Sequence, residues 1–301
     1  MANPTLKQFR YFAALSRYRH FGRAADACAI SQPALSMQVK ELEQTLGTAL
    51  LERGGRDVRL TPFGEVVASR AAAILQSVEE IEDLARASHA TLSGRLRIGV
   101  IPTIAPYLLP RLIGDLGRDY PGLDIQIRET QTQTLMDELT AGQIDTAILA
   151  LPVSAPAFTE VALFDEAFVL VRPAADADKP VPNRAMLREM RLLLLEEGHC
   201  FREQALSFCN APSVREWGGM DGSSLSTLVQ MVGAGMGVTL LPEMAINVES
   251  RSAPVAIGTF PDPQPTRTIG MIWRKTNPLA DQLAEVARVV KDAGQALRPR
   301  T

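Results

Sequence analysis

The stretch FGRAADACAISQPALSMQVKELEQTLG, residues 21–47, decides the fold of the N-terminal region. Ser31 is a good helix N-cap, and Pro33 is tolerated in the first turn of the helix that follows. An apolar stripe at helical spacing comes next, at Leu35, Val39, Leu42 and Leu46. The pattern predicts a helix with one buried face, joined by a tight connection to a short helix before it. Two such helices are typical of a helix-turn-helix.

The face of this helix opposite the apolar stripe is mostly polar. It holds Gln32, Pro33, Ser36, Met37 and Lys40. Gln and Lys side chains reach base edges and phosphates from a major groove, and a helix N-terminus adds backbone donors. The solvated face of an ordinary three-helix bundle explains the same residues equally well. The helix alone therefore leaves DNA binding undecided.

A basic segment, RGGRDVRLT at residues 53–61, follows the helix-turn-helix. It predicts a Gly-Gly turn between polar strands, a wing whose Arg53, Arg56 and Arg59 suit phosphate contacts. Residues 1–60 carry nine Lys or Arg against five Asp or Glu, whereas the remainder carries 22 against 29. The first sixty residues are thus the part suited to a polyanion. Helix-turn-helix and wing together favour double-stranded DNA as a partner.

Residues 62–88 repeat apolar side chains at spacings of three and four. This pattern predicts a helix of some seven turns with one apolar stripe and no globular neighbour in sequence. We expect the stripe to pack against the same helix of a second copy of the chain.

The composition limits the remaining classes. A chain of 301 residues buries a sizeable core without disulfides, and three cysteines do not make a secreted disulfide framework. The N-terminus lacks the pattern of a signal peptide, and no apolar run approaches the roughly 20 residues that span a bilayer. We expect a cytoplasmic protein with no membrane partner, in which resting thiols stay reduced.

Beyond Gly94 the pattern changes to strands alternating with helices, which predicts an α/β region of two lobes. The expected strands are Arg95–Ile101, Leu123–Glu129, Ile144–Leu151, Phe168–Arg172, Leu192–Glu196, Gly237–Pro242 and Thr268–Arg274.

Two of the three cysteines, Cys200 and Cys209, lie nine positions apart in EEGHCFREQALSFC. They suit a structural staple, a metal site, two core residues or a redox pair. Phe201 and Phe208 share a helical face, so we expect a short helix starting near Cys200, and a helix N-terminus favours the thiolate form of a cysteine. One His and two Cys do not supply four tetrahedral ligands, so we expect no metal and no cofactor. Cys28 is interpreted as a small apolar residue.

The order of basic winged helix-turn-helix, long helix and two-lobed α/β region resembles the LysR-type transcription regulators. The resemblance covers essentially the whole chain and is carried by residues 21–47, by LLERGGRDVRLTPFG at 50–64 and by GAGMGVTLLP at 233–242. It implies an α+β multidomain fold: a winged helix-turn-helix over 1–61, a linker and dimerisation helix over 62–92, and a periplasmic-binding-protein-like regulatory domain over 93–301. Lobe I would take 93–163 and 267–301, and lobe II 164–266.

Four further segments resemble the hydrogen-peroxide sensors of that family: IPTIAPYLLP (101–110), TQTLMDEL (132–139), EEGHCFREQALSFC (196–209) and TRTIG (266–270). The resemblance implies that peroxide oxidises Cys200, that Cys209 resolves it as a disulfide, and that the pocket is lined by Thr103, Thr132, His199, Arg202 and Arg267. It also implies a homotetramer built as a dimer of dimers, control of antioxidant genes at promoter operators, contact with RNA polymerase, and reset by a cellular thiol reductant.

Each pocket residue has a structural alternative. Thr103 and Thr132 suit helix caps, Arg202 and Arg267 suit surface ion pairs, and His199 suits a structural histidine. The chain also departs from the family: Gly54 and Gly55 replace a common Thr-Ser pair in the wing, and Gly219 and Met220 stand where some relatives place a His.

Two other functions compete with peroxide sensing. A LysR-type regulator would bind a small organic effector between the lobes and keep the cysteines for structure. A thiol peroxidase would turn over with a reductant, but an enzyme of that class has no use for the helix-turn-helix, so we expect no enzymatic activity.

Overall fold

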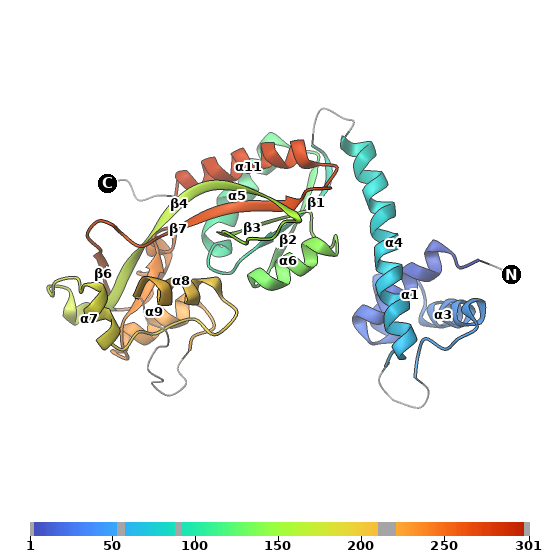
Figure 1. Cartoon of the computed structure of the whole chain (residues 1–301), viewed down its shortest axis with the longest axis horizontal. Coiled ribbons are helices and arrows are strands. Elements are labelled where there is room, and N and C mark those ends of the chain that lie inside the picture. Colours follow the sequence, from blue (N-terminus) through green and yellow to red (C-terminus); the bar gives the residue numbers. More distant parts are fainter. Residues whose placement is uncertain (1–2, 53–57, 88–91, 210–220, 298–301) are drawn as a thin grey trace. The chain divides into compact units, whose positions relative to one another are not determined.

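The computed structural model describes residues 3–52, 58–87, 92–209 and 221–297. The chain divides into two compact units, Met1–Ala85 and Arg86–Thr301, and each is described by itself. Figure 1 labels their elements along the chain. The first unit contains α1 (Leu6–Tyr18), α2 (Phe21–Ala27), α3 (Gln32–Leu46) and most of α4 (Pro62–Ala87).

The predicted helix-turn-helix is confirmed as α2 and α3. The Ser31 side chain accepts a hydrogen bond from the Ala34 amide at the start of α3, and Gly47 ends the helix in the left-handed conformation (φ 68°). Leu35, Val39 and Leu42 are buried as expected, in a small core that includes Phe12 and Leu15 of α1. The turn between α2 and α3 contains Ala29 at φ 52°. The apolar stripe therefore fixes which face of α3 is left exposed.

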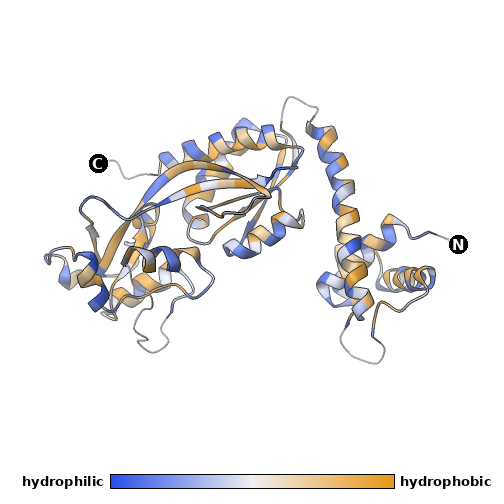
Figure 2. Cartoon of the chain, in the orientation of Figure 1, coloured by the Kyte–Doolittle hydropathy of each residue, from blue (hydrophilic) through white to orange (hydrophobic). Residues whose placement is uncertain are grey.

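The long helix predicted after the wing is confirmed as the 26 residues of α4. Figure 2 shows hydrophobic and hydrophilic residues alternating along its turns. Large apolar side chains stay exposed on it, at Phe63, Val66, Ile74, Ile81 and Leu84. Among the helices of the described residues, none is long and apolar enough to cross a membrane.

The second unit is a mixed α/β structure. Across its described residues, seven strands form one sheet in the order β2-β1-β3-β7-β4-β5, with β6 paired to β4. The strands are β1 (Gly94–Val100), β2 (Leu123–Glu129), β3 (Thr146–Leu151), β4 (Phe158–Pro173), β5 (Thr239–Pro242), β6 (Val255–Thr259) and β7 (Thr266–Arg274). The helices are α5 (Ala105–Asp119), α6 (Thr132–Thr140), α7 (Arg184–Glu189), α8 (Cys200–Cys209), α9 (Leu225–Gly233), α10 (Ile246–Glu249) and α11 (Ala280–Gln295), with single 3₁₀ turns η1 (Ala174–Asp176) and η2 (Glu243–Ala245).

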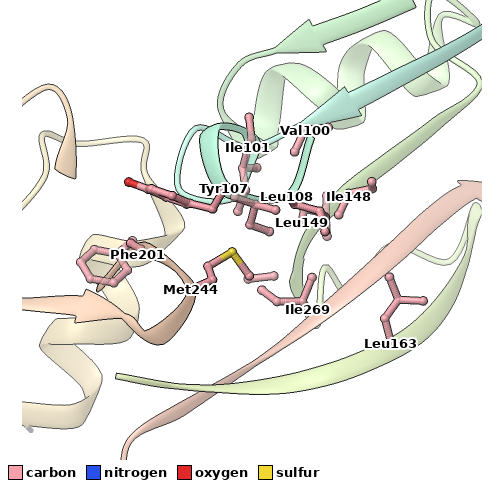
Figure 3. Packing of buried hydrophobic residues seen from close by; sticks show 14 of the residues in the cluster. Val100, Ile101, Tyr107, Leu108, Ile148, Leu149, Leu163, Phe201, Met244 and Ile269 are labelled. Carbon is pink, nitrogen blue, oxygen red and sulfur yellow. The ribbon is translucent and has the colours of Figure 1, made fainter. Parts of the chain in front are cut away.

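The predicted two-lobed α/β region is confirmed by this topology. Strands β1, β2 and β3 are mutually parallel through their βα connections, as expected where helices return the chain. The long strands β4 and β7 pair antiparallel over most of their length and carry the sheet from one lobe to the other (Figure 1). One continuous core lies under both lobes; Figure 3 shows part of it, with side chains of β1, β3, α5, α8 and β7 around Met244 of η2.

The strand predicted over Leu192–Glu196 is wrong. Leu192, Leu193, Leu194 and Leu195 are all buried, as the apolar run suggested. The segment forms only isolated bridges, from Leu192 to Val238 and from Leu195 to Gly222. The two bridges join the segment to two different neighbouring stretches, and each bridge is one residue long. Neither therefore extends into the hydrogen-bonded ladder of a strand. The expected strand over Phe168–Arg172 is instead the second half of the 16-residue β4.

Candidate functional site

The exposed face of α3 holds the residues that the sequence assigns to DNA. Gln32, Pro33, Ser36, Met37 and Lys40 are all exposed and lie on the side opposite the buried stripe. Gln32 begins the helix, where free backbone N–H groups favour negative charge. Arg59 is exposed and its carbonyl accepts a hydrogen bond from the Glu52 amide, while Arg53 and Arg56 lie outside the described residues.

Cys200 begins α8, as the sequence predicts, and its thiol is free. It is half-buried and lines a cavity of about 790 Å³. The other lining residues are Thr132, Gln133, Met136, Ala150–Val153, Phe168, Arg184, Gly198, Glu203, Gln204, Ser207, Phe208 and 264–266. Cys209 ends the same helix, and its side chain lies outside the described part.

Two residues that line this cavity each have a buried polar atom with no hydrogen-bond partner among the described residues. These atoms are the Oγ1 of Thr132, at the start of α6, and the Oε1 of Gln204, one helical turn after Cys200. A buried polar atom without a partner costs about 1–3 kcal/mol, so it points to a partner that binds there. Both residues lie close enough to the cavity for a small turn of the side chain to present these atoms to a small polar ligand beside Cys200.

Thr103 and Arg267 meet in a second, fully buried group. The Arg267 guanidinium donates to the Thr103 hydroxyl (2.8 Å) and carbonyl (3.1 Å) and forms an ion pair with Glu166 (2.7 Å). The other carboxylate oxygen of Glu166 accepts from the Met244 amide (2.9 Å). Arg267 lies 5.8 Å from the centre of the Phe168 ring, and Phe168 also lines the cavity, so this residue neighbours both groups.

His199 and Arg202 flank Cys200 along the chain but do not line the cavity. His199 is buried, and this burial lowers its pKa, although the Glu196 carboxylate at 4.0 Å acts in the opposite direction. Arg202 donates to the Leu195 carbonyl (2.9 Å) and pairs with Asp221 (3.0 Å). The guanidinium of Arg202 thus fastens the first turn of α8 to the preceding loop.

The structure brings the sequence-assigned residues together only in part. Thr132 and Cys200 share the cavity, whereas Thr103 and Arg267 are bonded to each other. Neither threonine caps a helix: the N-caps of α5 and α6 are Ile104 and Gln131. Gly219 and Met220 lie outside the described residues.

Sequence reasoning missed three residues of this region: Gln204, Glu166 and Phe168. Gln204 carried a usable signal, because residues four apart on a helix share a face and Cys200 is four positions before it. Glu166 and Phe168 carried none, since their partners are far away in the sequence.

The lowered pKa of His199 predicts an acid-sensitive fold. The unfolded chain binds a proton at this residue at about its ordinary pKa of 6.5, while the folded chain keeps it neutral to lower pH. Stability is therefore present above about pH 6.5 and is lost as the pH falls below it. We expect His199→Gln to flatten the fall in urea midpoint of the second unit between about pH 7 and 5.5. His20→Asn, in the first unit, is the control and should leave that fall unchanged; an equal slope in His199→Gln would contradict the assignment.

The comparisons with known proteins cover nearly the whole chain. Residues 6–65 match the model of the bacterial regulatory helix-turn-helix protein, lysR family, and residues 89–295 match the LysR substrate binding domain. The chain is 45% identical over 302 residues to a probable hydrogen peroxide-inducible genes activator of Streptomyces viridosporus, covering 99% of this chain and 96% of that protein. It is 41% identical to the DNA-binding transcriptional dual regulator OxyR of Escherichia coli K12, covering 95% and 96%.

Solved structures agree with these matches. A full-length OxyR variant from Pseudomonas aeruginosa superimposes with a TM-score of 0.74 and 37% identity, covering 96% of this chain and 98% of that one. An H2O2-bound OxyR mutant from Corynebacterium glutamicum gives a TM-score of 0.68 and 35% identity, covering 98% and 94%.

Proposed function

The chain belongs to the LysR family of bacterial transcription regulators, and from this premise we propose that it senses hydrogen peroxide through Cys200 and reports it to promoter DNA. One observation carries the proposal: a free thiol lines a cavity together with two residues that each have a buried polar atom without a partner among the described residues. Hydrogen peroxide has two O–H donors and two acceptor oxygens. In this proposal the Gln204 and Thr132 side chains turn toward the cavity, so that the Gln204 Oε1 accepts one of these hydrogens and the Thr132 hydroxyl bonds to the other end of the peroxide.

The first chemical step is attack of the Cys200 thiolate on one peroxide oxygen. The S–O bond forms, the O–O bond breaks, and hydroxide leaves with the electron pair, so that Cys200 becomes a sulfenic acid. Donors that stabilise this developing charge accelerate the step more than ionisation of the thiol alone. Arg267, bonded to both Thr103 and Glu166, supports the Phe168 side of the cavity, and His199 and Arg202 hold the first turn of α8 in place.

The second step joins Cys200 to Cys209. The Cys209 thiolate attacks the sulfenic sulfur, the S–S bond forms, and hydroxide leaves and takes up a proton as water. In the ten-residue α8 the two Cα atoms are about 13 Å apart by helical rise, whereas a disulfide tolerates roughly 4.4–6.8 Å. Part of α8 must therefore unwind before the bridge closes.

Mass spectrometry after brief peroxide exposure of the full chain tests this function. We expect a Cys200–Cys209 bridge and loss of amide-exchange protection across residues 202–209, because the helix no longer holds those amides. We also expect a shifted or shortened footprint on operator DNA, since a repacked subunit interface re-spaces the paired helix-turn-helix units. Superimposable exchange profiles for the two redox forms would reject the mechanism.

The assembly belongs to the same proposal. The exposed apolar residues of α4, among them Val66, Ile74 and Ile81, suit a dimer formed through this helix. We place a second contact between the regulatory domains of different dimers, which gives a dimer of dimers. This tetramer would bind promoter DNA in the cytoplasm, and RNA polymerase would be the partner that receives the signal. We place the end of the DNA-binding domain at residue 61 and the end of the linker helix at residue 92. The chain passes from lobe I to lobe II after residue 163 and returns to lobe I after residue 266. A cellular thiol reductant resets the disulfide, so the site acts once per cycle as a sensor.

The α3 face and the wing predict two separable effects on DNA binding. Arg56→Ala should weaken binding similarly across sequences and lower the slope of log affinity against log salt by about one, because one phosphate contact is lost. Gln32→Ala should instead relax base preference at one position by about 1–3 kcal/mol. Fluorescence anisotropy at several salt concentrations measures both. An unchanged salt slope for Arg56→Ala would reject the wing assignment.

The cavity volume favours one second candidate. A space of about 790 Å³ is far larger than peroxide needs and lies within the range of small-molecule sites. A small organic effector would bind there and bias the two lobes, with the thiols uninvolved. A transcriptional response to peroxide that survives Cys200→Ser would favour this candidate.

A further inference from the structure

An aromatic residue near each end of α8 packs the helix against the rest of the second unit. Phe201, next to Cys200, is fully buried and meets the Phe168 ring edge to face, with centroids 5.3 Å apart and planes at 85°. Phe208, next to Cys209, is only partly buried and meets Phe260 at 5.2 Å and 65°. The two are seven positions apart, so they lie on the same face of the helix. The two ends of α8 are thus anchored unequally.

A third group closes over the weaker anchor. The Arg184 guanidinium carbon lies 4.7 Å from the centre of the Phe208 ring. Arg184 is the first residue of α7, directly after Asn183, whose side chain caps that helix by accepting from the Met186 amide (2.9 Å). This cap stabilises the first turn of the helix that carries the guanidinium. A cation over the face of an aromatic ring is attracted by the ring quadrupole.

We propose that Arg184 is a positioning residue for the resolving step: its contact with Phe208 latches the C-terminal end of α8 and sets how often Cys209 is released toward Cys200. This inference rests on the proposed function only for the chemistry that follows the release. Phe201 keeps the Cys200 end in place, so the Cys209 end of the helix is the one that moves.

The contact between Arg184 and Phe208 affects the rate of disulfide formation through the equilibrium between closed and open α8 that precedes the chemical step. Cys209 attacks the Cys200 sulfenic acid, forming S–S and expelling hydroxide, only in molecules whose α8 has opened. When opening and closing are fast, the observed rate is the opening equilibrium constant multiplied by the rate in the open form. A cation–π contact at a partly exposed site changes such a constant about two- to five-fold.

The variants separate the charge of Arg184 from its packing. Arg184→Met keeps an apolar stem without the cation, and Arg184→Lys keeps a cation without the planar group. Phe208→Leu removes the ring that the cation contacts. Arg251→Met removes an exposed cation elsewhere in the second unit and is the matched control. The double variant Arg184→Met, Phe208→Leu closes a mutant cycle, in which the loss of Arg184 should have no effect once the ring is gone.

Amide exchange of the reduced full-length chain tests the latch without peroxide. We expect exchange over residues 204–208 to be about two- to five-fold faster in Arg184→Met, less so in Arg184→Lys, and unchanged in Arg251→Met. Equal exchange in the wild-type chain and Arg184→Met would overturn the proposal. Faster exchange throughout the second unit would also overturn it, because that result describes general destabilisation.

Rapid quenching after mixing with peroxide tests the consequence. The first phase, sulfenic acid on Cys200, should depend on peroxide concentration and be the same in the wild-type chain and in Arg251→Met. The second phase, bridge formation, should be independent of peroxide and about two- to five-fold faster in Arg184→Met. An unchanged second phase would overturn the positioning role. Absence of the first phase in the wild-type chain would instead reject the proposed function, and the exchange experiment would then decide the latch alone.

Discussion

The Cys200→Ser variant is expected to show no fast oxidation by hydrogen peroxide and to keep the DNA footprint of the reduced protein at every peroxide dose. The thiolate is the nucleophile, and a serine hydroxyl at the same position does not take its place. Cys209→Ser should still form a sulfenic acid on Cys200 at the wild-type rate and stop there, because no thiol is available to expel hydroxide. Dimedone labelling with mass spectrometry measures both results.

Cys28→Ser is the control for this pair. Cys28 follows α2 in the first unit, and burial raises the pKa of its thiol, so little of it is thiolate at neutral pH. Its removal should change neither the sulfenic acid nor the bridge. Dimedone found on Cys209 in preference to Cys200 would reverse the two roles.

Arg267→Met should lower the free energy of unfolding of the second unit by about 3–5 kcal/mol, since it leaves the Glu166 carboxylate buried without its partner. The Arg267 side chain is fully buried and that of Glu166 is 4% exposed, so water does not replace the lost ion pair. Urea unfolding of the full chain, followed by exchange in β4 and β7, measures the loss. Arg267→Met combined with Glu166→Gln should recover part of it, because the uncompensated charge is gone.

The exposed pair Arg19–Glu65 provides the matched control. Its atoms are as close, at 2.8 Å, but the side chains are 43% and 54% exposed. Solvent screening limits such a pair to about 0–1 kcal/mol, so Arg19→Met should cost little. If Arg267→Met lowered the free energy of unfolding by less than about 1 kcal/mol, the prediction would be wrong, because the buried Glu166 carboxylate would then tolerate the loss of its ion-pair partner.

Local patterns predicted the elements whose partners are near in sequence. Ser31, the stripe from Leu35 to Leu42 and Gly47 specify α3 completely, because cap, buried face and end all lie within seventeen residues. The helix between Cys200 and Cys209 followed in the same way from Phe201 and Phe208. The run Leu192–Leu195 was wrongly predicted as a strand. A buried segment has the same apolar run whether or not a neighbouring strand is present to pair with it, and here only isolated bridges form.

The sequence named candidate site residues one by one but not how they are arranged. Thr103 and Arg267 are 164 positions apart and Glu166 and Arg267 are 101 apart, so only the tertiary fold decides that they bond to one another and not to a ligand. Thr132 and Gln204, which line the cavity with Cys200, each keep a buried polar atom without a partner among the described residues. The resemblance named candidate side chains for this region. The hydrogen bonds show that Thr103 and Arg267 are bonded to each other, whereas the Thr132 hydroxyl has no partner among the described residues.

The separation of the two thiols along α8 also bears on recovery after the stress has passed. Any free energy that the helix loses when the bridge closes is regained when the bridge is cut, so it is added to the driving force for reduction. For a two-electron couple, each 1.4 kcal/mol of this kind raises the midpoint potential by about 30 mV. In the proposed cycle, a thiol pair that is hard to join is therefore easier for a cellular thiol reductant to separate, so the length of α8 would shorten the response to peroxide that has already been removed.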